Sequence, residues 1–249
     1  MSKRSGAGAS ILLGLMCFAA PAAALVGPAT QDATFAPHVV MVLKRDAHGA
    51  GFCTGIVVAR DVILTAAHCA ADAANLRIHL PGGDASGFIS VAQTAVNPGF
   101  RPDAPRTRER SIDLALLRTA SPLPANLRPV AIDWASVAQV GTHYQIAGFG
   151  LTREQDGRTG GTLRSGTLAA RAPLSNILLW AEDPQGKGLG ACTGDSGGPV
   201  FTASGDSLVA VTVWSTGAGK KACGAVTQAA WLAPQRGWFE SVLRGWSAR

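Results

Sequence analysis

The chain has 249 residues, of which 47% are hydrophobic and only 15% are charged, so it is long and apolar enough to bury a sizeable core. Its formal net charge is +6, but no run of basic residues is longer than two, which argues against nucleic acid as a partner. Thirty Gly and fourteen Pro predict many turns, and therefore short strands more than long helices.

The first 24 residues have the layout of a secretory signal peptide. Lys3 and Arg4 precede an apolar run from Ile11 to Ala20, and the small residues 22–24 suit a cleavage site. The run is too short to span a bilayer comfortably, and no second run of spanning length follows. We therefore expect a protein that is secreted or periplasmic and free of the membrane after cleavage.

Cys17 lies inside this peptide, and removing it leaves four cysteines, namely Cys53, Cys69, Cys192 and Cys223. In an oxidising compartment four cysteines indicate two disulfides, and the residues alone allow three pairings. No pair has the C-x-x-C spacing of a zinc site, so we expect neither a metal nor another cofactor.

From Leu25 onward the pattern is that of short β-strands. Apolar runs or alternating residues predict strands at 39–43, 55–58, 62–65, 76–80, 113–117, 144–147, 163–168, 177–181 and 208–213. Pro81–Asp84 is typical of a turn, 97–110 of a solvated loop with several arginines, and Ser121–Pro129 of a linker between two halves. After Pro234 the residues Trp238, Phe239, Val242, Leu243 and Trp246 fall on one face, which predicts a C-terminal helix.

Thr193–Pro199 is the stretch that best combines a reactive group with unusual backbone. Its glycines permit positive φ or close approach to a ligand, so Ser196 can be presented on a turn whose N–H groups converge on one point. His68 follows an apolar strand and adjoins Cys69, and Asp113 stands at the start of a buried strand. These are candidates for a base and for the acid that orients it, although each is also compatible with a structural role.

Three segments in this order resemble the chymotrypsin/trypsin family of serine endopeptidases: Thr65–Cys69, Asp113–Leu117 and Gly194–Pro199. Gly141–Gly150 resembles a further family segment, and the likeness extends from Leu25 to about residue 246. It implies an all-β fold of two six-stranded antiparallel barrels with a C-terminal helix and the active site between the barrels. The implied boundaries are 1–24 for the signal peptide, 25–125 for the first barrel, 126–233 for the second, and 234–249 for the helix and tail.

The resemblance implies a mechanism of acyl transfer. Ser196 attacks the peptide carbonyl, His68 accepts and returns the proton, and Asp113 orients the imidazole. The N–H groups of Gly194 and Ser196 form the oxyanion hole. The resemblance also selects the pairings Cys53–Cys69 and Cys192–Cys223. We expect a monomer whose partners are polypeptide substrates and protein protease inhibitors.

Gly190, six residues before the nucleophile, corresponds to the base of the pocket for the P1 side chain, where trypsin-like members carry Asp. Its lack of charge predicts an uncharged, apolar P1 residue in place of Arg or Lys. The pair Lys220-Lys221 would instead favour an acidic P1 residue, but a solvated loop tip explains it better. The other expected substrate contacts are Thr193, Trp214, Ser215 and Gly224.

Leu25-Val26-Gly27-Pro28 resembles the segment whose new α-amine activates family members by pairing with the acid at Asp195. We therefore expect signal cleavage itself to create the activating terminus at Leu25. Val213 departs from the family, which usually has there a Ser bonded to the catalytic Asp, and this could weaken activity. Tyr144 replaces a half-cystine that many relatives have. A weak or inactive homologue that acts as a binding protein, or a secreted esterase, are the alternative functions.

Overall fold

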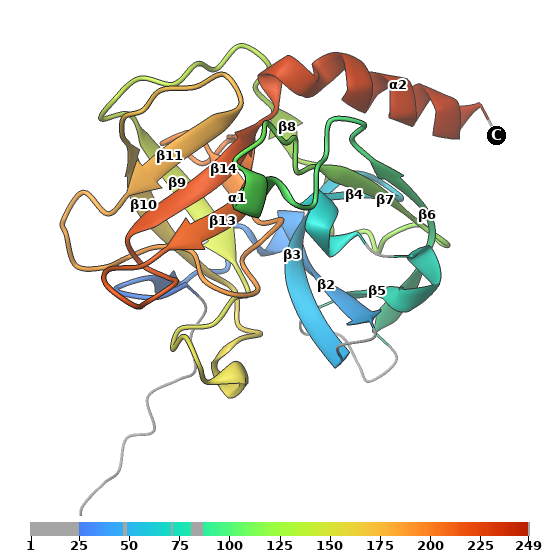
Figure 1. The fold of residues 1–249 in the computed structure, drawn as a ribbon. Helices are drawn as coiled ribbons and strands as arrows, with labels where there is room; N and C mark the ends of the chain where they lie inside the picture. Colours follow the sequence, from blue (N-terminus) through green and yellow to red (C-terminus); the bar gives the residue numbers. More distant parts are fainter. Residues whose placement is uncertain (1–24, 47–48, 71, 81–86, 249) are drawn as a thin grey trace, which may run out of the picture.

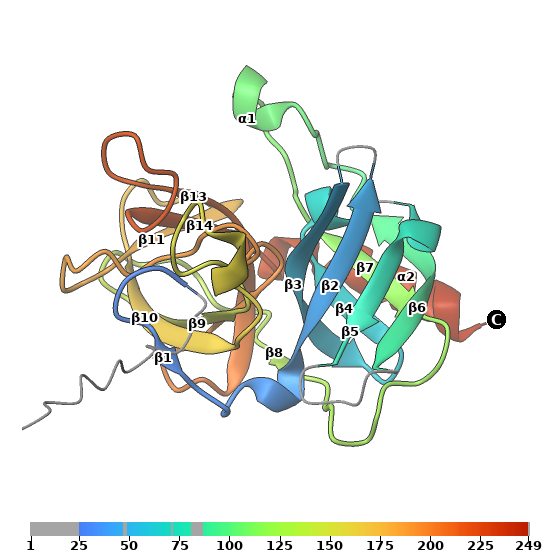
Figure 2. The ribbon, with the colours of Figure 1, turned by 90° about the horizontal axis from the view of Figure 1, so that it is seen from below.

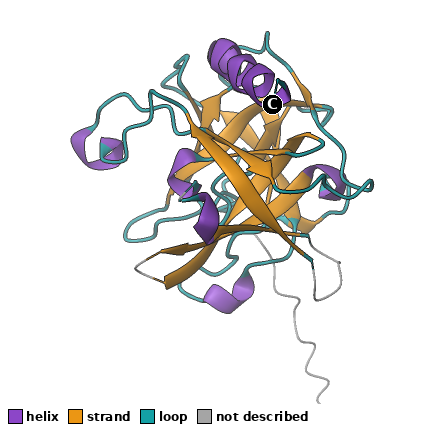
Figure 3. Ribbon diagram, turned by 90° about the vertical axis from the view of Figure 1, so that its right-hand side faces the viewer, coloured by secondary structure: helices purple, strands orange, loops and turns teal. Residues whose placement is uncertain are grey.

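The computed structural model describes residues 25–46, 49–70, 72–80 and 87–248. The predicted signal peptide at 1–24 and the predicted turn at Pro81–Asp84 lie outside the described residues. Two β-barrels lie side by side, and a helix at the C-terminus lies over the first of them (Figure 1). Strands dominate over helices in both barrels, as the composition predicts (Figure 3).

The first barrel is a closed sheet of six antiparallel strands in the order β2-β3-β4-β7-β6-β5, in which β5 returns to pair with β2. Every residue of β4 is buried, which explains its continuous apolar sequence. The bounds are Val39–Asp46 (β2), Gly49–Ala59 (β3), Val62–Thr65 (β4), Leu76–His79 (β5), Phe88–Val96 (β6) and Ala115–Thr119 (β7).

The second barrel also has six antiparallel strands, in the order β9-β10-β11-β14-β13-β12, and it closes where β9 pairs with both β10 and β12. Two short strands add to its edges, β1 (Thr30–Gln31) beside β10 and β8 (Ala131–Ile132) beside β13. The bounds are His143–Gly148 (β9), Arg164–Ala170 (β10), Leu178–Glu182 (β11), Pro199–Phe201 (β12), Ser207–Thr216 (β13) and Val226–Trp231 (β14).

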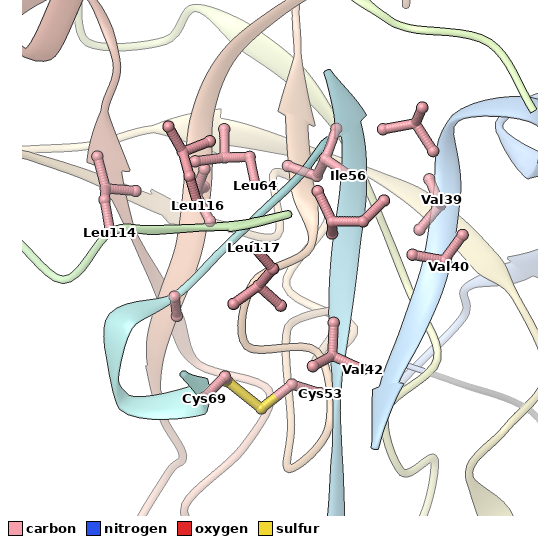
Figure 4. Packing of buried hydrophobic residues seen from close by; sticks show 14 of the residues in the cluster. Val39, Val40, Val42, Cys53, Ile56, Leu64, Cys69, Leu114, Leu116 and Leu117 are labelled. Carbon is pink, nitrogen blue, oxygen red and sulfur yellow. A yellow bond between two sulfur atoms is a disulfide. The ribbon is translucent and has the colours of Figure 1, made fainter. Parts of the chain in front are cut away.

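One hydrophobic core runs from the first barrel into the interface with the second. Figure 4 shows its first-barrel part, where Ile56, Leu64 and Leu117 are fully buried near the Cys53–Cys69 disulfide. Across the interface Phe35 stacks on Phe201 of β12, with ring centroids 4.6 Å apart. The barrels are therefore joined by apolar packing, which fixes the two walls of any site between them.

The helix α2 (Arg236–Ser247) follows a 3₁₀ turn at Ala233–Gln235, close to the predicted start at Pro234. Its Phe239 is buried against Trp134 with the rings edge-on, and the other predicted apolar residues of this face are partly buried. The remaining short helices are α1 (Ala104–Thr107) and 3₁₀ turns at Ala36–His38, Ala67–Cys69, Ala73–Asn75 and Gly157–Thr159.

Each predicted strand overlaps an observed one, but three barrel strands and the two short edge strands β1 and β8 were not predicted. The alternation of β6 is broken by a register shift between Val91 and Gln93. β12 has only three residues and begins with Pro199. β14 contains Thr, Gln and two Ala, and it is stabilised by pairing on both sides with β11 and β13. The loop predicted at 97–110 contains the single turn α1, which projects away from the barrels (Figure 2).

Candidate active site

His68 and Asp113 are brought together by the pairing of β4 with β7. Thr65, the last residue of β4, lies opposite Ala115, the first residue of β7. The chain just after β4 and the chain just before β7 therefore leave the sheet at the same end. The 3₁₀ turn Ala67–Cys69 then carries His68 towards Asp113, and the disulfide of Cys69 fixes this turn to β3.

Two hydrogen bonds join these residues. The backbone N–H of His68 donates to Asp113 Oδ1 at 2.9 Å, and the ring Nδ1 lies 2.6 Å from Asp113 Oδ2. An ionised carboxylate can only accept, so Nδ1 carries the hydrogen and the neutral ring keeps Nε2 as a proton acceptor. The arrangement is that of an oriented general base.

The turn that carries Ser196 is held by the first barrel. The amide of Thr54 in β3 donates to the carbonyl of Ser196 at 2.8 Å, and the Thr54 hydroxyl donates to the carbonyl of Gly194 at 2.8 Å. Gly197 has φ +85°, and a Cβ there would lie 2.1 Å from the Thr54 carbonyl oxygen and from the Thr65 hydroxyl oxygen. Only glycine fits this contact between the barrels.

The peptide between Thr193 and Gly194 is oriented for anion binding. The N–H of Leu151 donates to the Thr193 carbonyl at 2.8 Å, and the N–H of a trans peptide points the opposite way from its carbonyl. Within the described residues, the N–H groups of Gly194 and Ser196 donate no hydrogen bond. Gly194 has φ +96°, and a Cβ there would strike the ring of Phe52. Two free N–H donors beside a nucleophile suit an oxyanion.

A cleft of about 590 Å³ lies between the barrels. Among the predicted site residues it is lined by His68, Thr193, Gly194, Ser196, Trp214 and Ser215. Ser196 and His68 both line this cleft, and no hydrogen bond joins their side chains in the described chain. Trp214 is 51% exposed, so a large aromatic surface is open to a bound chain.

Gly190 and Gly224 do not line this cleft. They lie against each other, and a Cβ on Gly190 would be 3.1 Å from the Cα of Gly224. Thr227, which was not predicted, is buried beside them, and its hydroxyl oxygen accepts a hydrogen bond from the N–H of Ala191 at 3.0 Å. Thr227 pairs with Ser215 across β13 and β14. The short loop before β14 obscured this register in the sequence.

Asp195 points away from the cleft into the second barrel. Its carboxylate accepts hydrogen bonds from the N–H groups of Gly150 at 2.7 Å and Cys192 at 2.9 Å. A Cβ on Gly148 or Gly150 would lie within 2.3 Å of a carboxylate oxygen of Asp195, so both positions require glycine. Full burial raises the pKa of Asp195 to about 7. The hydrogen bonds from the two N–H donors lower this pKa, but their effect is smaller than that of burial.

Leu25 is buried in the same barrel, and Val26 forms a two-way backbone bridge with Gly190 at 3.1 and 3.2 Å. Leu25 has φ 58°, a left-handed conformation that L-residues adopt at a cost of about 1–2 kcal/mol. The first described residues are thus fixed beside the segment that precedes the nucleophile. Leu25 and Asp195 make no hydrogen bond or ion pair in the described chain.

The disulfides are Cys53–Cys69 and Cys192–Cys223, the pairing that the family resemblance selects. Potential metal-ligand atoms of Cys53, His68 and Cys69 lie within 4.8 Å of one another. Because these two sulfurs are bonded to each other, they offer no thiolate to a metal ion. The bond instead fixes the backbone beside the imidazole.

The sequence is similar to a known protein family and to individual proteins. The trypsin family model matches residues 25–233. Trypsin epsilon from Drosophila erecta is 30% identical over 207 residues, which cover 74% of this chain and 74% of that protein. Ovochymase from Halocynthia roretzi is 26% identical over 174 residues, which are 59% of this chain but only 10% of that protein.

Solved structures show the same fold. Neuropsin, a serine protease of mouse brain, superposes with a TM-score of 0.70 at 20% identity, covering 87% of this chain and 99% of that chain. The scabies mite inactivated protease paralogue S-I1 superposes with a TM-score of 0.68 at 21% identity, covering 88% of this chain and 99% of that chain. The fold is therefore shared by a protease and by an inactivated paralogue, so activity must be argued from the site.

Proposed function

Because the chain belongs to the trypsin family of serine proteases, we propose that it is an endopeptidase that cleaves polypeptides through Ser196, His68 and Asp113. The observation that carries the proposal is the hydrogen bond of His68 to Asp113, because His68 lines the same cleft as Ser196 and Gly194, whose N–H groups donate no hydrogen bond among the described residues. A merely structural histidine would have no need of a nucleophile and an anion site beside it.

The reaction follows from these positions. Ser196 Oγ attacks the peptide carbonyl carbon while its proton passes to His68 Nε2, and the carbonyl oxygen becomes an oxyanion. The N–H groups of Gly194 and Ser196 stabilise this oxygen, and one such donor is typically worth about 3–4 kcal/mol. His68 then protonates the leaving amine, and water repeats the sequence on the acyl-enzyme. Asp113 stabilises the imidazolium that forms in between.

The cleft favours a P1 side chain that is uncharged and small. Gly190 supplies no carboxylate for Arg or Lys, and the buried Thr227 fills the space next to it. Gly190 and Gly224 lie against each other, and neither lines the cleft. Lys220 and Lys221 are exposed and lie on the loop between β13 and β14, which supports their role as a solvated tip.

Signal cleavage before Leu25 is the proposed activation step. A cut there removes the constraint on the φ angle of Leu25, and it creates an ammonium group near the N-terminal bridge of Val26 to Gly190. Asp195 is the buried carboxylate that this group would pair with, since an unpaired buried charge is unfavourable by several kcal/mol. N-terminal sequencing of the exported protein tests this step, and a mature start several residues from Leu25 would contradict it.

Export outside the cytoplasm is supported by the two disulfides, which persist in oxidising compartments. No helix within the described residues combines the length and apolarity needed to cross a membrane.

One observation favours the alternative of a weak or inactive homologue that acts as a binding protein. Val213 is buried, lines the cleft and offers no hydroxyl to Asp113. The Asp113 carboxylate accepts only from His68 in the described chain, so it has less support than a third donor would give. Intact positions for the nucleophile, base and oxyanion donors argue against this alternative.

Labelling with an organophosphonate, followed by cleavage of a peptide library, tests the proposal. We expect one label on Ser196, none on the Ser196→Ala variant, and cleavage after small uncharged residues. Absence of labelling on properly processed protein would favour the binding function. Labelling with hydrolysis of esters but not of peptides would favour an esterase.

A further inference from the structure

One wall of the cleft is attached to the rest of the site through Ala222. This residue is exposed and lines the cleft together with Cys223. Its backbone N–H donates to Glu154 Oε1 at 2.8 Å, and its carbonyl accepts from the Ser215 hydroxyl at 3.0 Å. The next residue, Cys223, is fixed by its disulfide. Both polar backbone groups of Ala222 are thus bound by side chains from two different segments.

The loop that carries Glu154 is itself ordered. Thr159 is buried, its hydroxyl donates to the carbonyl of Asp156 at 2.7 Å, and its oxygen accepts from the N–H of Arg153 at 3.2 Å. The Arg153 guanidinium also pairs with the Asp156 carboxylate at 2.8 Å. Since the backbone is fixed on both sides of the half-buried Glu154, its carboxylate is presented to Ala222 with little further loss of conformational freedom.

The same loop begins at the oxyanion peptide. The N–H of Leu151 orients the Thr193 carbonyl. The side chain of Leu151 packs against the disulfide-bonded Cys192 and Cys223 in one small apolar cluster. The loop therefore contacts the lining of the cleft at two points, through Leu151 beside the Thr193–Gly194 peptide and through Glu154 at Ala222. A change at Glu154 can alter the wall while Leu151 keeps the oxyanion peptide in place.

We propose that Glu154 and Ser215 are positioning residues that clamp Ala222 and thereby set the width of the cleft for the P1 side chain. The functional part rests on the peptidase function proposed above. The Ser215 hydroxyl donates its hydrogen bond to the Ala222 carbonyl. It therefore contributes to P1 selectivity by fixing the position of Ala222 in the wall of the cleft. A Cβ on Gly217 would lie 2.5 Å from the Lys221 backbone, so the hairpin between β13 and β14 is tightly folded next to Ala222.

Substitution of Glu154 tests the clamp by its kinetics. Glu154→Ala removes the acceptor, so we expect KM for a substrate with a small P1 residue to rise about fivefold, with kcat nearly unchanged because the reacting atoms are not touched. Cleavage after larger P1 residues should rise relative to cleavage after small ones. Glu154→Gln keeps an acceptor oxygen and should restore most of the wild-type behaviour. Gln155→Ala, an exposed neighbour without a hydrogen bond among the described residues, is the matched control.

Ser215→Ala should produce the same change in P1 profile, and the double variant with Glu154→Ala should be less than additive, because both act through Ala222. Equal KM and P1 profiles in wild type, Glu154→Ala and Gln155→Ala would overturn the proposal.

Hydrogen exchange of the Ala222 amide, measured on the Ser196→Ala background, gives a readout that needs no activity. We expect Glu154→Ala to speed exchange at Ala222 about tenfold while the core amides of β13 stay protected, and Glu154→Gln to do so much less. Unchanged exchange would overturn the clamp. If the wild type neither labels nor cleaves, the proposed peptidase function fails, and the exchange measurement still decides whether the clamp exists.

Discussion

The buried carboxylate of Asp195 should make the stability of the uncut chain fall as pH rises. In the structure, where residues 1–24 are still attached, burial raises the pKa of Asp195 from 3.8 to about 7. The folded state therefore holds a proton that the unfolded state has already lost. This stabilising effect is fully present below pH 3.8 and is lost progressively as pH rises to about 7. A shift of about three units corresponds to a loss of about 4 kcal/mol.

Asp195→Asn isolates this contribution, because the amide cannot ionise. Other carboxyl groups have lowered pKa values, such as Asp32 and Asp183. They stabilise both proteins equally as pH rises, so their contributions cancel in the difference between the two free energies of unfolding. On the Ser196→Ala background, which prevents self-cleavage, the difference in unfolding free energy between the aspartate and asparagine forms of the full chain should shrink or reverse by about 4 kcal/mol between pH 4 and pH 8. Urea unfolding at each pH measures it.

The same pair of proteins beginning at Leu25 provides the decisive comparison. If the new α-ammonium pairs with Asp195, the ionised form is stabilised and the loss above pH 4 should largely disappear. Asp195→Asn should then lower the stability of this shorter form, and in a version that retains Ser196 it should also lower the labelling of Ser196. A difference that does not depend on pH in the full chain would refute the reasoning from burial, and an equal pH dependence in both forms would refute the pairing.

Three other changes follow from individual contacts. Gly150→Ala would put a Cβ 2.3 Å from the Asp195 carboxylate, so it should reduce Tm and activity sharply, whereas Gly157→Ala, which meets nothing within 4 Å, should be within about 0.5 kcal/mol of the wild type in urea unfolding. Thr227→Ala removes buried side-chain volume and should increase kcat/KM for larger apolar P1 residues relative to alanine in a peptide library. Val213→Ser offers a hydroxyl to the Asp113 carboxylate and, if the proposed mechanism is right, should raise kcat severalfold, measured by peptide hydrolysis from pH 5 to pH 9.

Most strands of both barrels could be predicted because they carry the local signal themselves. Buried strands such as Val62–Thr65 are continuously apolar, and Leu76–His79 alternates in sequence as it does in burial. β6 and β14 lack such a signal, since a register shift interrupts one and pairing on both sides supports the other. Where tertiary pairing replaces local preference, the sequence pattern is a poor guide.

The candidate site was predictable at the residues that belong to recognisable motifs and not at those that support them. His68, Asp113 and Ser196 stand in three such motifs. Thr54 and Leu151, by contrast, hold the nucleophile turn through a hydroxyl and a backbone N–H, and neither group has a sequence pattern of its own. Such contacts depend on how two distant segments meet, which periodicity does not encode.

Those contacts also imply that the proposed active site forms only when the two barrels dock. The first barrel supplies His68 and Asp113, and through Thr54 it binds the carbonyls of both Gly194 and Ser196 in the second barrel. Since these two carbonyls belong to the residues whose N–H groups form the proposed oxyanion hole, the docking of β3 sets the conformation of that turn. If the proposal is right, the oxyanion hole depends on the interface, and a loosened interface should lower kcat before it lowers the content of secondary structure.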